Sequence, residues 1–465
     1  MSEPTIFFFC TDPERALGLE RLLPNFHIVC IDGGDIVEAM REKNVKIFSL
    51  SEELDNPNPI KRNTNVLLQN PKAQEYIKRN TSEQSEPSIM VFKVAPNIER
   101  TCEKLGYNLL NTSSKLNRKF ELKISQYQSL SLPGIRFPET IISSLQNLNF
   151  DIISKEFGLP FVIQFDRGHT GGGTIFIREE AQLRSLAREF PKRIVRTAKM
   201  ISGTAWTINA CVTRFGIAYG GLSKQITGIK GLTKMEGGTV GNDWSASKHL
   251  DSSTINQVTE MTRRIGSEMY KANYSGIFGV DFIIDDGGEV FVIEVNARPV
   301  ASISMHNKIM LQHKLIPFHL LHISEFLFAS DAEYLNFINQ KTGQNLKPAE
   351  MTAFIQDLNI ASIKPIEASQ IILRNTSNQE EKVKKKIESG VYNQNGWVRS
   401  GYSIDHIQEE NEFLVLYAEK KRTISPNSEV GRIQAKESII NQDGKIEKKF
   451  HKAIKKMQQG ITKLS

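Results

Sequence analysis

The stretch GVDFIIDDGGEVFVIEVNARP at residues 279–299 limits the folds available to this chain more than any other segment. Two apolar runs flank Asp-Asp-Gly-Gly, and Asp-Gly between apolar runs is a strong signal for a β-hairpin. With Asp-Gly at the centre of the turn, Asp281 lies opposite Val292 and diagonal to Glu294. Because side chains alternate between the two faces of a strand, Asp281, Glu294 and Asn296 share one face. A register slip of one residue would move Asp281 to the opposite face.

Two carboxylates this close repel each other, and one of them would stay protonated without a counter-charge. Mg²⁺ prefers oxygen ligands, usually one or two carboxylates with phosphate oxygens and water. Asn296 adds a neutral amide oxygen, and Arg298 follows two residues later, where it can pair with a phosphate. We therefore predict Asp281, Glu294 and Asn296 as ligands of Mg²⁺ or Mn²⁺, and Arg298 as a catalytic residue. The alternative is a solvated hairpin face, which the apolar character of the segment disfavours.

A second segment, FVIQFDRGHTGGGTIFI, carries four glycines between two apolar runs. A hairpin turn needs only one or two glycines, and additional glycines allow backbone N–H groups to wrap phosphate oxygens. Threonines in the loop add hydroxyl donors. The segment is either a phosphate-binding loop or a hairpin tip without function. For the first alternative, the predicted phosphate contacts are Thr170, Gly171, Gly172, Gly173 and Thr174.

The first 110 residues alternate short apolar runs with segments of helical periodicity. Strands are expected in TIFFFC, HIVCID, VKIFSL and SIMVFKV, and helices at residues 13–23, 34–43 and 96–106. This alternation predicts an α/β fold, in which helices cover both faces of a parallel sheet. The glycine fingerprint of dinucleotide-binding sheets is absent from the sequence, so no dinucleotide is expected here.

The rest of the chain predicts two further units. Up to about residue 328, strands and helices alternate less regularly, with a hairpin turning at RFG and an amphipathic helix at 254–274. The polar segment 328–348 is expected to link to a third unit, which combines strands with a basic helix near the end. The predicted domains are 1–114, 115–330 and 345–465.

The composition is ordinary for a soluble globular protein, with 39% hydrophobic and 24% charged residues and no apolar run near the roughly 20 residues of a membrane helix. The four cysteines lie far apart, which disfavours disulfides or a zinc site and favours the reducing cytoplasm. The net charge is +7, and residues 371–465 hold 18 Lys and Arg against 12 Asp and Glu, a difference of 6. No aromatic residues are interleaved with these charges, so a solvated basic surface is expected in preference to a nucleic-acid groove.

Together the glycine loop, the segment ISGTAWTINACV and the acidic hairpin resemble the ATP-grasp superfamily. The hairpin is the most specific of these features, because the family ends its site with an acid, then Glu-x-Asn and a nearby Arg. The resemblance covers about residues 115–328, and the first unit is similar to the domain that precedes the ATP-grasp fold in this family. It implies an α+β ATP-grasp fold preceded by a parallel-sheet domain and followed by a small C-terminal α+β domain. It also implies ATP and Mg²⁺ as ligands.

Further positions match the motifs of the family. Lys119, in NRKFELKISQYQ, matches a lysine that reaches nucleotide phosphate, and Lys199, Met200 and Ile201 match the hinge that contacts adenine. Two positions depart from the family pattern. Gln164 stands where a strand lysine is usual, so it can donate a hydrogen bond but carries no charge. The hinge segment RTAKMISG has none of the acids that commonly bind adenine or ribose.

The resemblance implies a carboxylate–amine ligase, most similar to bacterial peptide ligases, that forms an acyl phosphate from ATP and releases ADP. The sequence has no recognisable Ser-His-Asp or Cys-His arrangement, which agrees with a reaction that depends on positioning. Lys224, Gln225 and Asn242 are predicted to bind the substrate, an amino acid or peptide, unless their segment is only a connector. The alternatives are a phosphotransferase acting on a hydroxyl or on bicarbonate, and a regulatory ATP-binding module without turnover. No membrane or nucleic-acid partner is expected, and the chain is compatible with a homodimer.

Overall fold

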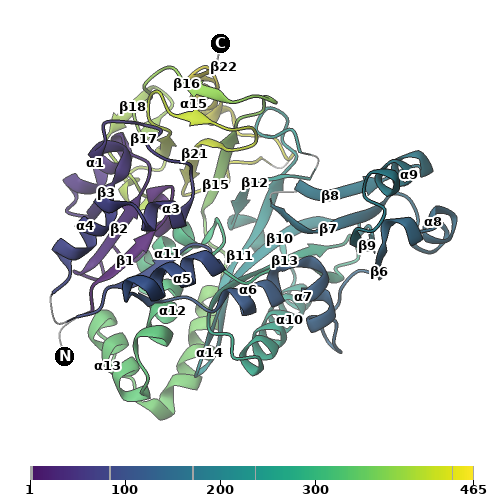
Figure 1. The fold of residues 1–465 in the computed structure, drawn as a ribbon, viewed down its shortest axis with the longest axis horizontal. Coiled ribbons are helices and arrows are strands. Elements are labelled where there is room, and N and C mark those ends of the chain that lie inside the picture. The colour runs from purple at the N-terminus through teal and green to yellow at the C-terminus, as the bar shows by residue number, and fades with distance from the viewer. Residues whose placement is uncertain (1–3, 83–84, 170–171, 236, 442, 464–465) are drawn as a thin grey trace.

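The structure is a computed structural model that describes residues 4–82, 85–169, 172–235, 237–441 and 443–463. Its N-terminal part is a five-stranded parallel sheet with the order β3-β2-β1-β4-β5 (Figure 1). The strands are β1 (Ile6–Phe9), β2 (Phe26–Cys30), β3 (Lys46–Ser49), β4 (Ser88–Val91) and β5 (Asn108–Leu109). All residues of β1, β2 and β4 are buried, as expected for strands covered on both faces. The predicted parallel sheet is confirmed.

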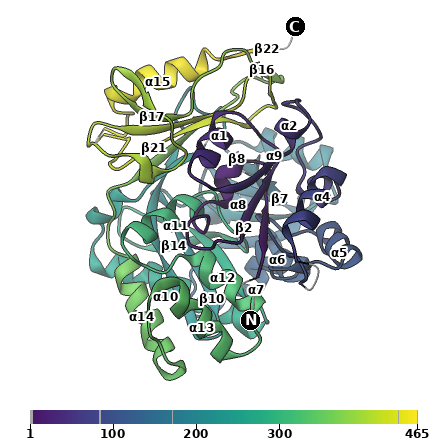
Figure 2. The same ribbon diagram turned by 90° about the vertical axis from the view of Figure 1, so that its left-hand side faces the viewer.

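Helices cover both faces of this sheet (Figure 2). They are α1 (Asp35–Glu42) on one face and α3 (Thr64–Leu68), α4 (Pro71–Asn80) and α5 (Pro96–Leu105) on the other, with the short α2 (Leu50–Glu53) after β3. The helix predicted at 13–23 is wrong, because only Pro13–Ala16 form a 3-10 turn. Gly18 follows with φ +125°, and a Cβ atom there would lie 2.7 Å from the Cβ of Asn307. The chain turns at this point to pack closely against a distant segment.

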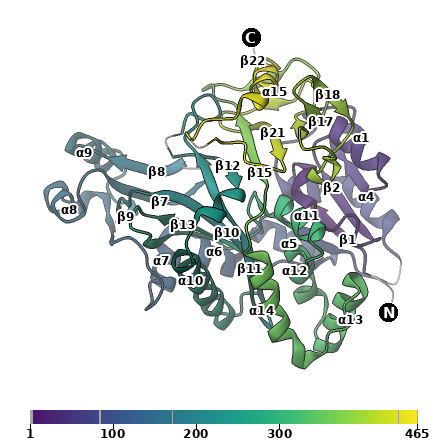
Figure 3. The same cartoon turned by 180° about the vertical axis from the view of Figure 1, so that it is seen from behind.

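A four-stranded antiparallel sheet with the order β6-β9-β7-β8 projects from the body of the molecule (Figures 1 and 3). Its strands are β6 (Thr140–Ser144), β7 (Phe161–His169), β8 (Gly172–Ile177) and β9 (Ile194–Lys199). Helices α8 (Phe150–Phe157) and α9 (Glu180–Glu189) cover one face through a separate apolar cluster that includes Ile163, Leu183 and Val195. The hairpin of β7 and β8 carries the glycine loop.

A ten-stranded sheet forms the centre of the molecule, in the order β14-β13-β10-β11-β12-β15-β21-β19-β17-β18. It contains β10 (Thr204–Thr213), β11 (Gly216–Thr227), β12 (Thr239–Asp243), β13 (Gly276–Ile284), β14 (Val290–Asn296), β15 (Ser369–Arg374), β17 (Gly390–Asn393), β18 (Gly396–Arg399), β19 (Phe413–Tyr417) and β21 (Glu429–Ala435). The hairpin predicted at RFG is the turn between β10 and β11. Strands from the third predicted unit continue the same sheet, since β15 pairs with β12.

Two groups of helices sandwich the half of this sheet that carries the acids. On one face lie α6 (Ser114–Glu121), α7 (Lys123–Leu130) and α10 (Ser252–Lys271). On the other face lie α11 (Ile303–Gln312), α12 (Phe318–Leu327), α13 (Asp331–Thr342) and α14 (Met351–Ser362). The segment 328–348, predicted as a linker, therefore contains a packed helix. Ser330 caps α13 by accepting a hydrogen bond from the Glu333 backbone N–H, and Gly343 ends it with φ 71°.

The C-terminal part adds a small sheet with the order β20-β16-β22 and one helix. These elements are β16 (Glu381–Val383), β20 (Thr423–Ile424), β22 (Ile461–Lys463) and α15 (Lys448–Gln458). Further 3-10 turns lie at Leu145–Asn147, Ser245–His249, Pro348–Glu350 and Ile404–His406. Within the described ranges, every helix is too short or too polar to cross a lipid bilayer.

Candidate functional site

The acids of the 279–299 segment lie in β13 and β14, at the edge of the ten-stranded sheet. Phe282 pairs with Val292, which is one residue away from the predicted register. This slip alone would put Asp281 and Glu294 on opposite faces. A β-bulge adds one residue, Ile293, before Glu294, so that Asp281 and Glu294 are directly opposite each other on one face. The shared face is confirmed, and the predicted diagonal arrangement is wrong.

Three polar side chains hold the Asp281 carboxylate. Its Oδ1 atom accepts hydrogen bonds from Thr207 Oγ1 at 2.6 Å and from Gln225 Nε2 at 3.0 Å, and its Oδ2 atom accepts one from Asn296 Nδ2 at 3.1 Å. Burial, and next the charge of Glu294, raise the pKa of Asp281 to about 6. The hydrogen bonds from Thr207 and Asn296 and the charge of Arg298 offset this rise in pKa only in part.

Lys123 contacts the second acid, and the sequence had not singled it out. Its Nζ atom lies 2.9 Å from Glu294 Oε1, and the lysine side chain is only 5% exposed. The extended backbone of Leu122 separates α6 from α7 and makes Lys123 the first residue of α7. Lys119, the predicted lysine, lies in α6 and is exposed, with its Nζ atom 5.1 Å from the centroid of the Phe120 ring. The structure thus brings Lys123, not Lys119, to the acids.

Arg298 lies beside the acids in a network of charges around the buried Glu121. Its Nη2 atom donates to Asn296 Oδ1 at 3.1 Å, and its Nε atom donates to Glu121 Oε1 at 3.0 Å. Lys93 also pairs with Glu121, at 2.6 Å. Burial would raise the pKa of Glu121, but Arg298 and Lys93 outweigh it and hold this pKa at about 2. Glu121 therefore stays ionised and fixes the guanidinium of Arg298 next to the predicted metal ligands.

The four-stranded sheet contributes a second set of polar side chains. Gln164 on β7 is buried and donates to Thr174 Oγ1 on β8 at 3.4 Å. On the neighbouring strand β9, Arg196 lies directly opposite Gln164 and is also buried. Gly172 begins β8, and Gly173 has φ +135°, a conformation that favours glycine. Thr170 and Gly171, which complete the predicted phosphate contacts, lie outside the described residues.

The predicted hinge follows the end of β9. Lys199 is the last residue of β9, and its Nζ atom lies 3.2 Å from Glu139 Oε1. Met200 is 40% exposed, and Ile201 is half-buried. The hinge has no acid of its own in the sequence, but the segment before β6 places the carboxylate of Glu139 against it.

Of the three predicted substrate residues, the structure brings one to the acids. Gln225 donates to Asp281, and its own Oε1 accepts a hydrogen bond from Thr239 Oγ1 at 2.6 Å. Asn242 lies opposite Gln225 on β12 but is buried, and it donates to Ser223 Oγ at 3.1 Å. Lys224 points to the other face of β11 and is exposed.

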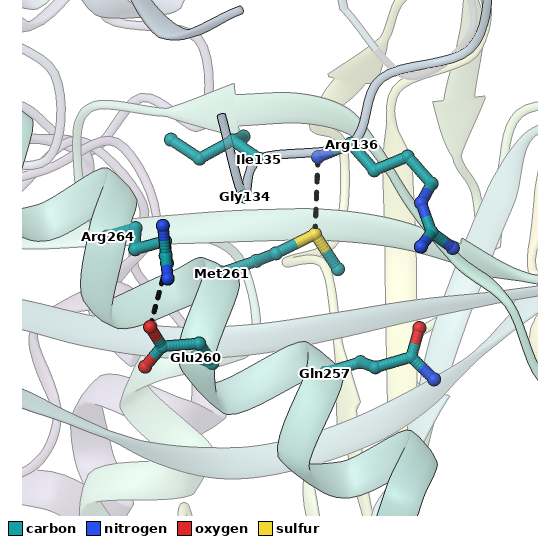
Figure 4. A pocket seen from close by; sticks show the side chains of 7 residues that line it. All are labelled: Gly134, Ile135, Arg136, Gln257, Glu260, Met261 and Arg264. Carbon is teal, nitrogen blue, oxygen red and sulfur yellow. Dashed lines mark hydrogen bonds and ion pairs between the residues drawn. The ribbon is translucent and has the colours of Figure 1, made fainter. Parts of the chain in front are cut away.

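A hollow of about 450 Å³ lies elsewhere, between the segment 134–136 and helix α10 (Figure 4). Its lining residues are Gly134, Ile135, Arg136, Gln257, Glu260, Met261 and Arg264. Met261 packs on the sheet face that carries Val280 and Phe282, which is opposite to the face of Asp281. The two arginines of the hollow are already paired, Arg264 with Glu260 at 2.7 Å and Arg136 with Glu289. The hollow is therefore separate from the acids.

The residues around Asp281 suit a hard divalent cation. Two carboxylates and a carboxamide are oxygen donors of the kind that Mg²⁺ prefers, and a cation there would supply positive charge beside Asp281. In the described part of the chain, no group of three or more His, Cys, Asp or Glu side chains could hold a metal by itself. The pair thus fits a cation that takes its remaining ligands from a phosphate and water, as Mg²⁺ does in nucleotide sites.

Comparisons with known proteins agree with this geometry. Residues 121–302 match the family model described as an ATP-grasp domain. Among solved structures, a biotin carboxylase from Campylobacter jejuni has a TM-score of 0.57 at 14% identity, over 99% of this chain and 92% of its own. An L-amino acid ligase from Bacillus licheniformis has a TM-score of 0.56 at 12% identity, over 99% and 98%.

A third structure is the biotin carboxylase domain of a Hydrogenobacter thermophilus 2-oxoglutarate carboxylase, in complex with MgADP, ADP and bicarbonate. Its TM-score is 0.57 at 13% identity, over 94% of this chain and 86% of its own. A comparison with curated protein sequences gives no match. At these identities the structural likeness concerns the fold, and the family match covers the segment that holds Glu121, Lys123, both acids and Arg298. Residues 121–302 thus match the ATP-grasp domain family, and the whole chain shares its fold with these carboxylases and with the L-amino acid ligase.

Proposed function

We propose that the protein is an ATP-dependent carboxylate–amine ligase that forms an amide bond through an acyl-phosphate intermediate. The observation that carries this proposal is the pairing of Asp281 with Glu294 across the bulge, with Lys123 bound to Glu294 and Arg298 bound to Asn296. This arrangement supplies two carboxylates that can bind a metal ion. It also supplies two positively charged side chains, Lys123 and Arg298, that can bind phosphate oxygens. With both acids assigned to the metal ion, the arrangement suits direct phosphoryl transfer, which depends on positioning and charge stabilisation.

Asp281, Glu294 and Asn296 are proposed to hold Mg²⁺, which would neutralise charge on the phosphoryl group in transfer. Thr207 and Gln225 orient Asp281 through their hydrogen bonds to Oδ1. Arg298 is held in place by Glu121. Its guanidinium would donate hydrogen bonds to the oxygens of the transferred phosphoryl group, where negative charge develops. The glycine loop with Gly172 and Gly173 is proposed to cover the nucleotide phosphates, and the hinge from Lys199 to Ile201 to contact adenine.

The proposed reaction has two steps. A carboxylate oxygen attacks the γ-phosphorus of ATP, and the bond to the β,γ-bridging oxygen breaks to release ADP. The amine then attacks the acyl carbon, the bond to the phosphate oxygen breaks, and the amine loses a proton. Exclusion of water by the loop would protect the acyl phosphate between the two steps.

The carboxylate substrate is proposed to be an amino acid or a short peptide that lies beside Gln225. Two features support this assignment. Gln225 is the predicted substrate residue in contact with Asp281, and an amide side chain can hydrogen-bond to a carboxylate. One of the structural neighbours is an L-amino acid ligase, although its TM-score of 0.56 nearly equals the 0.57 of the carboxylases. Bicarbonate is therefore included among the acids to be assayed.

The site test is Glu294→Gln, which removes a charged cation ligand without changing side-chain volume. We expect turnover to fall by at least about 100-fold, because the metal ligand acts on the transferring phosphoryl group. Asp286→Asn is the matched control, since it makes the same chemical change at an exposed position in the same hairpin. Wild-type activity of Glu294→Gln at limiting Mg²⁺ would contradict the proposed metal site.

The products distinguish the ligase from its alternatives. With both substrates present, ADP, phosphate and amide should form in equal amounts, and hydroxylamine should intercept the acyl phosphate as a hydroxamate. Formation of AMP and pyrophosphate would reject the mechanism. ADP with a stable phosphorylated product would favour a phosphotransferase, and no turnover over a broad panel of acids and amines would favour a regulatory module. Gln164, which carries no charge, and the hinge segment, which has no acid in its sequence, are the features that motivate the last alternative.

We also propose a cytoplasmic location and the domain boundaries 1–114, 115–330 and 345–465. All four cysteines are buried and unpaired, which supports a reducing compartment.

The β12–β15 pairing joins the second and third of these domains in one sheet. The C-terminal domain would therefore form part of the wall of the site and move with the ATP-grasp domain.

A further inference from the structure

We propose that Arg196 is a positioning residue that holds the bulge at Ile293 and thereby keeps Glu294 opposite Asp281. The proposal rests on the proposed function in one respect, since it takes this acid pair as the site of the Mg²⁺–nucleotide complex. Arg196 would act through the backbone of β14 and would not touch the nucleotide. It would couple the sheet that carries the glycine loop to the strand that carries the metal ligands.

The first observation is the contact itself. Arg196 lies on β9 of the four-stranded sheet, and its side chain is on the face away from α8 and α9, since its neighbour Val195 packs toward those helices. From there its Nη1 atom donates a hydrogen bond of 3.1 Å to the carbonyl oxygen of Ile293, in the ten-stranded sheet. One side chain thus bridges the two sheets.

The second observation is that the carbonyl bound by Arg196 lies at the β-bulge, on the outer edge of the sheet. Ile293 is the extra residue of the bulge and has no register partner on β13. β14 is the last strand of its sheet, so the outer edge of β14 must find partners elsewhere. Val292 N–H donates to the carbonyl of Arg136, and Val295 N–H donates to Gln126 Oε1. Of these three contacts, the one at the bulge comes from the other sheet.

The third observation is the electrostatic cost of using an arginine here. Arg196 is 1% exposed, and no carboxylate of the described residues lies within ion-pair distance of it. Its guanidinium carbon lies 5.4 Å from the ring centroids of both Tyr127 and Phe137, and its Nε atom has no hydrogen-bond partner. Burial lowers the pKa of Arg196 to about 10, so the side chain stays charged at neutral pH.

A buried charge without an ion-pair partner is destabilising, so a packing role alone would be filled better by an apolar residue. The reach of an arginine allows one side chain to extend from β9 across the gap between the sheets to the bulge carbonyl. The two neighbouring aromatic rings beside the guanidinium replace part of its lost hydration. The geometry therefore favours a role that needs this hydrogen bond at Ile293, the residue immediately before Glu294.

Loss of the bridge would let β14 shift at the bulge, and a shift of one residue there moves Glu294 to the other face. We therefore expect loss of Arg196 to reduce the Mg²⁺-dependent gain, which is the ratio of the nucleotide affinity with Mg²⁺ to the affinity without it. A direct contact between Arg196 and phosphate would instead change nucleotide affinity with or without the metal. These two roles can be separated by binding measurements alone.

The test measures the affinity for ADP by titration calorimetry, once with excess Mg²⁺ and once with EDTA. Arg196→Met keeps much of the volume and removes the donor, and Arg196→Lys keeps a donor but shortens its reach. Arg193→Met is the matched control, because Arg193 is exposed and directly precedes β9. We expect Arg196→Met to reduce the Mg²⁺-dependent gain by about 10- to 100-fold, the usual effect of losing support for a metal ligand. Arg196→Lys should recover part of this gain, and Arg193→Met should retain all of it.

An unchanged Mg²⁺-dependent gain in Arg196→Met would overturn the proposal. Equal losses of affinity with Mg²⁺ and with EDTA would also overturn it, since they indicate direct phosphate contact or general unfolding. If Arg196→Met does not fold, a reduced gain in a folded Arg196→Lys supports the proposal and a full gain overturns it. If the wild-type protein binds ADP no better with Mg²⁺ than without, the proposed metal site fails and the role of Arg196 fails with it.

Discussion

At the scale of single residues, the site depends on charges that meet across large distances in the sequence. Glu121 and Lys123 flank the break between α6 and α7, and each contacts the acidic hairpin, Glu121 through Arg298 and Lys123 through Glu294. Glu139 similarly meets Lys199 at the hinge, at 3.2 Å. In each case a charged side chain pairs with an opposite charge from another segment, and this pairing was not evident in the sequence.

Lys123 and Lys119 should differ in their effect on ATP turnover. Lys123→Met removes a buried charge that pairs with Glu294, so ATP turnover should fall by the equivalent of about 1.5–3 kcal/mol, the range for a charged hydrogen bond. Lys119→Met should have little effect, because Lys119 is exposed and its Nζ atom lies beside the Phe120 ring. The measurement is kcat/KM for ATP in both variants. A larger loss in Lys119→Met than in Lys123→Met would reverse the assignment and support the original prediction.

At the scale of elements, helices α11 and α12 carry three buried histidines directly after the acidic hairpin. Burial lowers the pKa of His306 and His319 to about 3 and that of His322 to about 4. His322 accepts a hydrogen bond from Ile277 N–H on β13, and its Nε2 atom lies 2.8 Å from the carbonyl of Leu110. The neutral ring thus ties the ten-stranded sheet to the N-terminal part of the chain.

These histidines predict a loss of stability at mildly acidic pH. An unfolded histidine binds a proton below about pH 6.5, whereas the folded one stays neutral down to the lowered pKa. Stability is therefore complete above pH 6.5 and falls by roughly 1.4 kcal/mol per pH unit for each histidine below it. Between pH 7.5 and pH 5.5, only the unit below pH 6.5 contributes to this loss. His319→Phe should therefore reduce the difference in unfolding free energy between these two pH values by about 1.4 kcal/mol. His249→Gln, at an exposed position, is the control, and equal pH dependence of all three proteins would contradict the prediction.

At the scale of the whole molecule, the C-terminal residues complete structures that begin far earlier in the chain. β15 covers the edge of β12, and β21, β19, β17 and β18 extend the sheet further. Arginines from this part also neutralise acids of the N-terminal sheet. Arg422 lies 2.8 Å from Asp32, and Arg432 lies 3.2 Å from Glu14. All four side chains are buried, so these ion pairs join the first and last parts of the chain.

Removal of residues 345–465 should therefore destabilise the rest of the protein. The truncated chain would expose the edge of β12, would leave Asp32 with Arg62 alone, and would remove Arg432 from Glu14. Loss of one partner of a buried pair costs about 3–5 kcal/mol. We expect the fragment 1–344 to aggregate or to lose its cooperative melting transition. Size-exclusion chromatography and thermal melting would check this result, and a monomeric fragment with a cooperative transition would contradict it.

Local patterns in the sequence were sufficient for much of this fold. Apolar runs between helical segments predicted the parallel sheet, and the Asp-Gly turn predicted the hairpin of β13 and β14. Other local predictions were wrong for definite reasons. Residues 13–23 do not form a helix, because Gly18 packs against Asn307. The segment 328–348 contains α13, whose buried side includes Tyr334 and Ile338. Both errors depended on contacts with distant segments.

The sequence by itself determined which residue types the site would contain, because the acids, the amide and the arginine occur together in one apolar hairpin. Only the tertiary structure decided how they are arranged. The turn slips by one residue and the bulge at Ile293 restores the shared face, and no short-range signal distinguishes this outcome from a regular hairpin. Likewise, no glycine or proline marks the break at Leu122 that brings Lys123 to Glu294. Periodicity reports which side of an element is buried, whereas register, bulges and charge partners are fixed by the segments that pack against it.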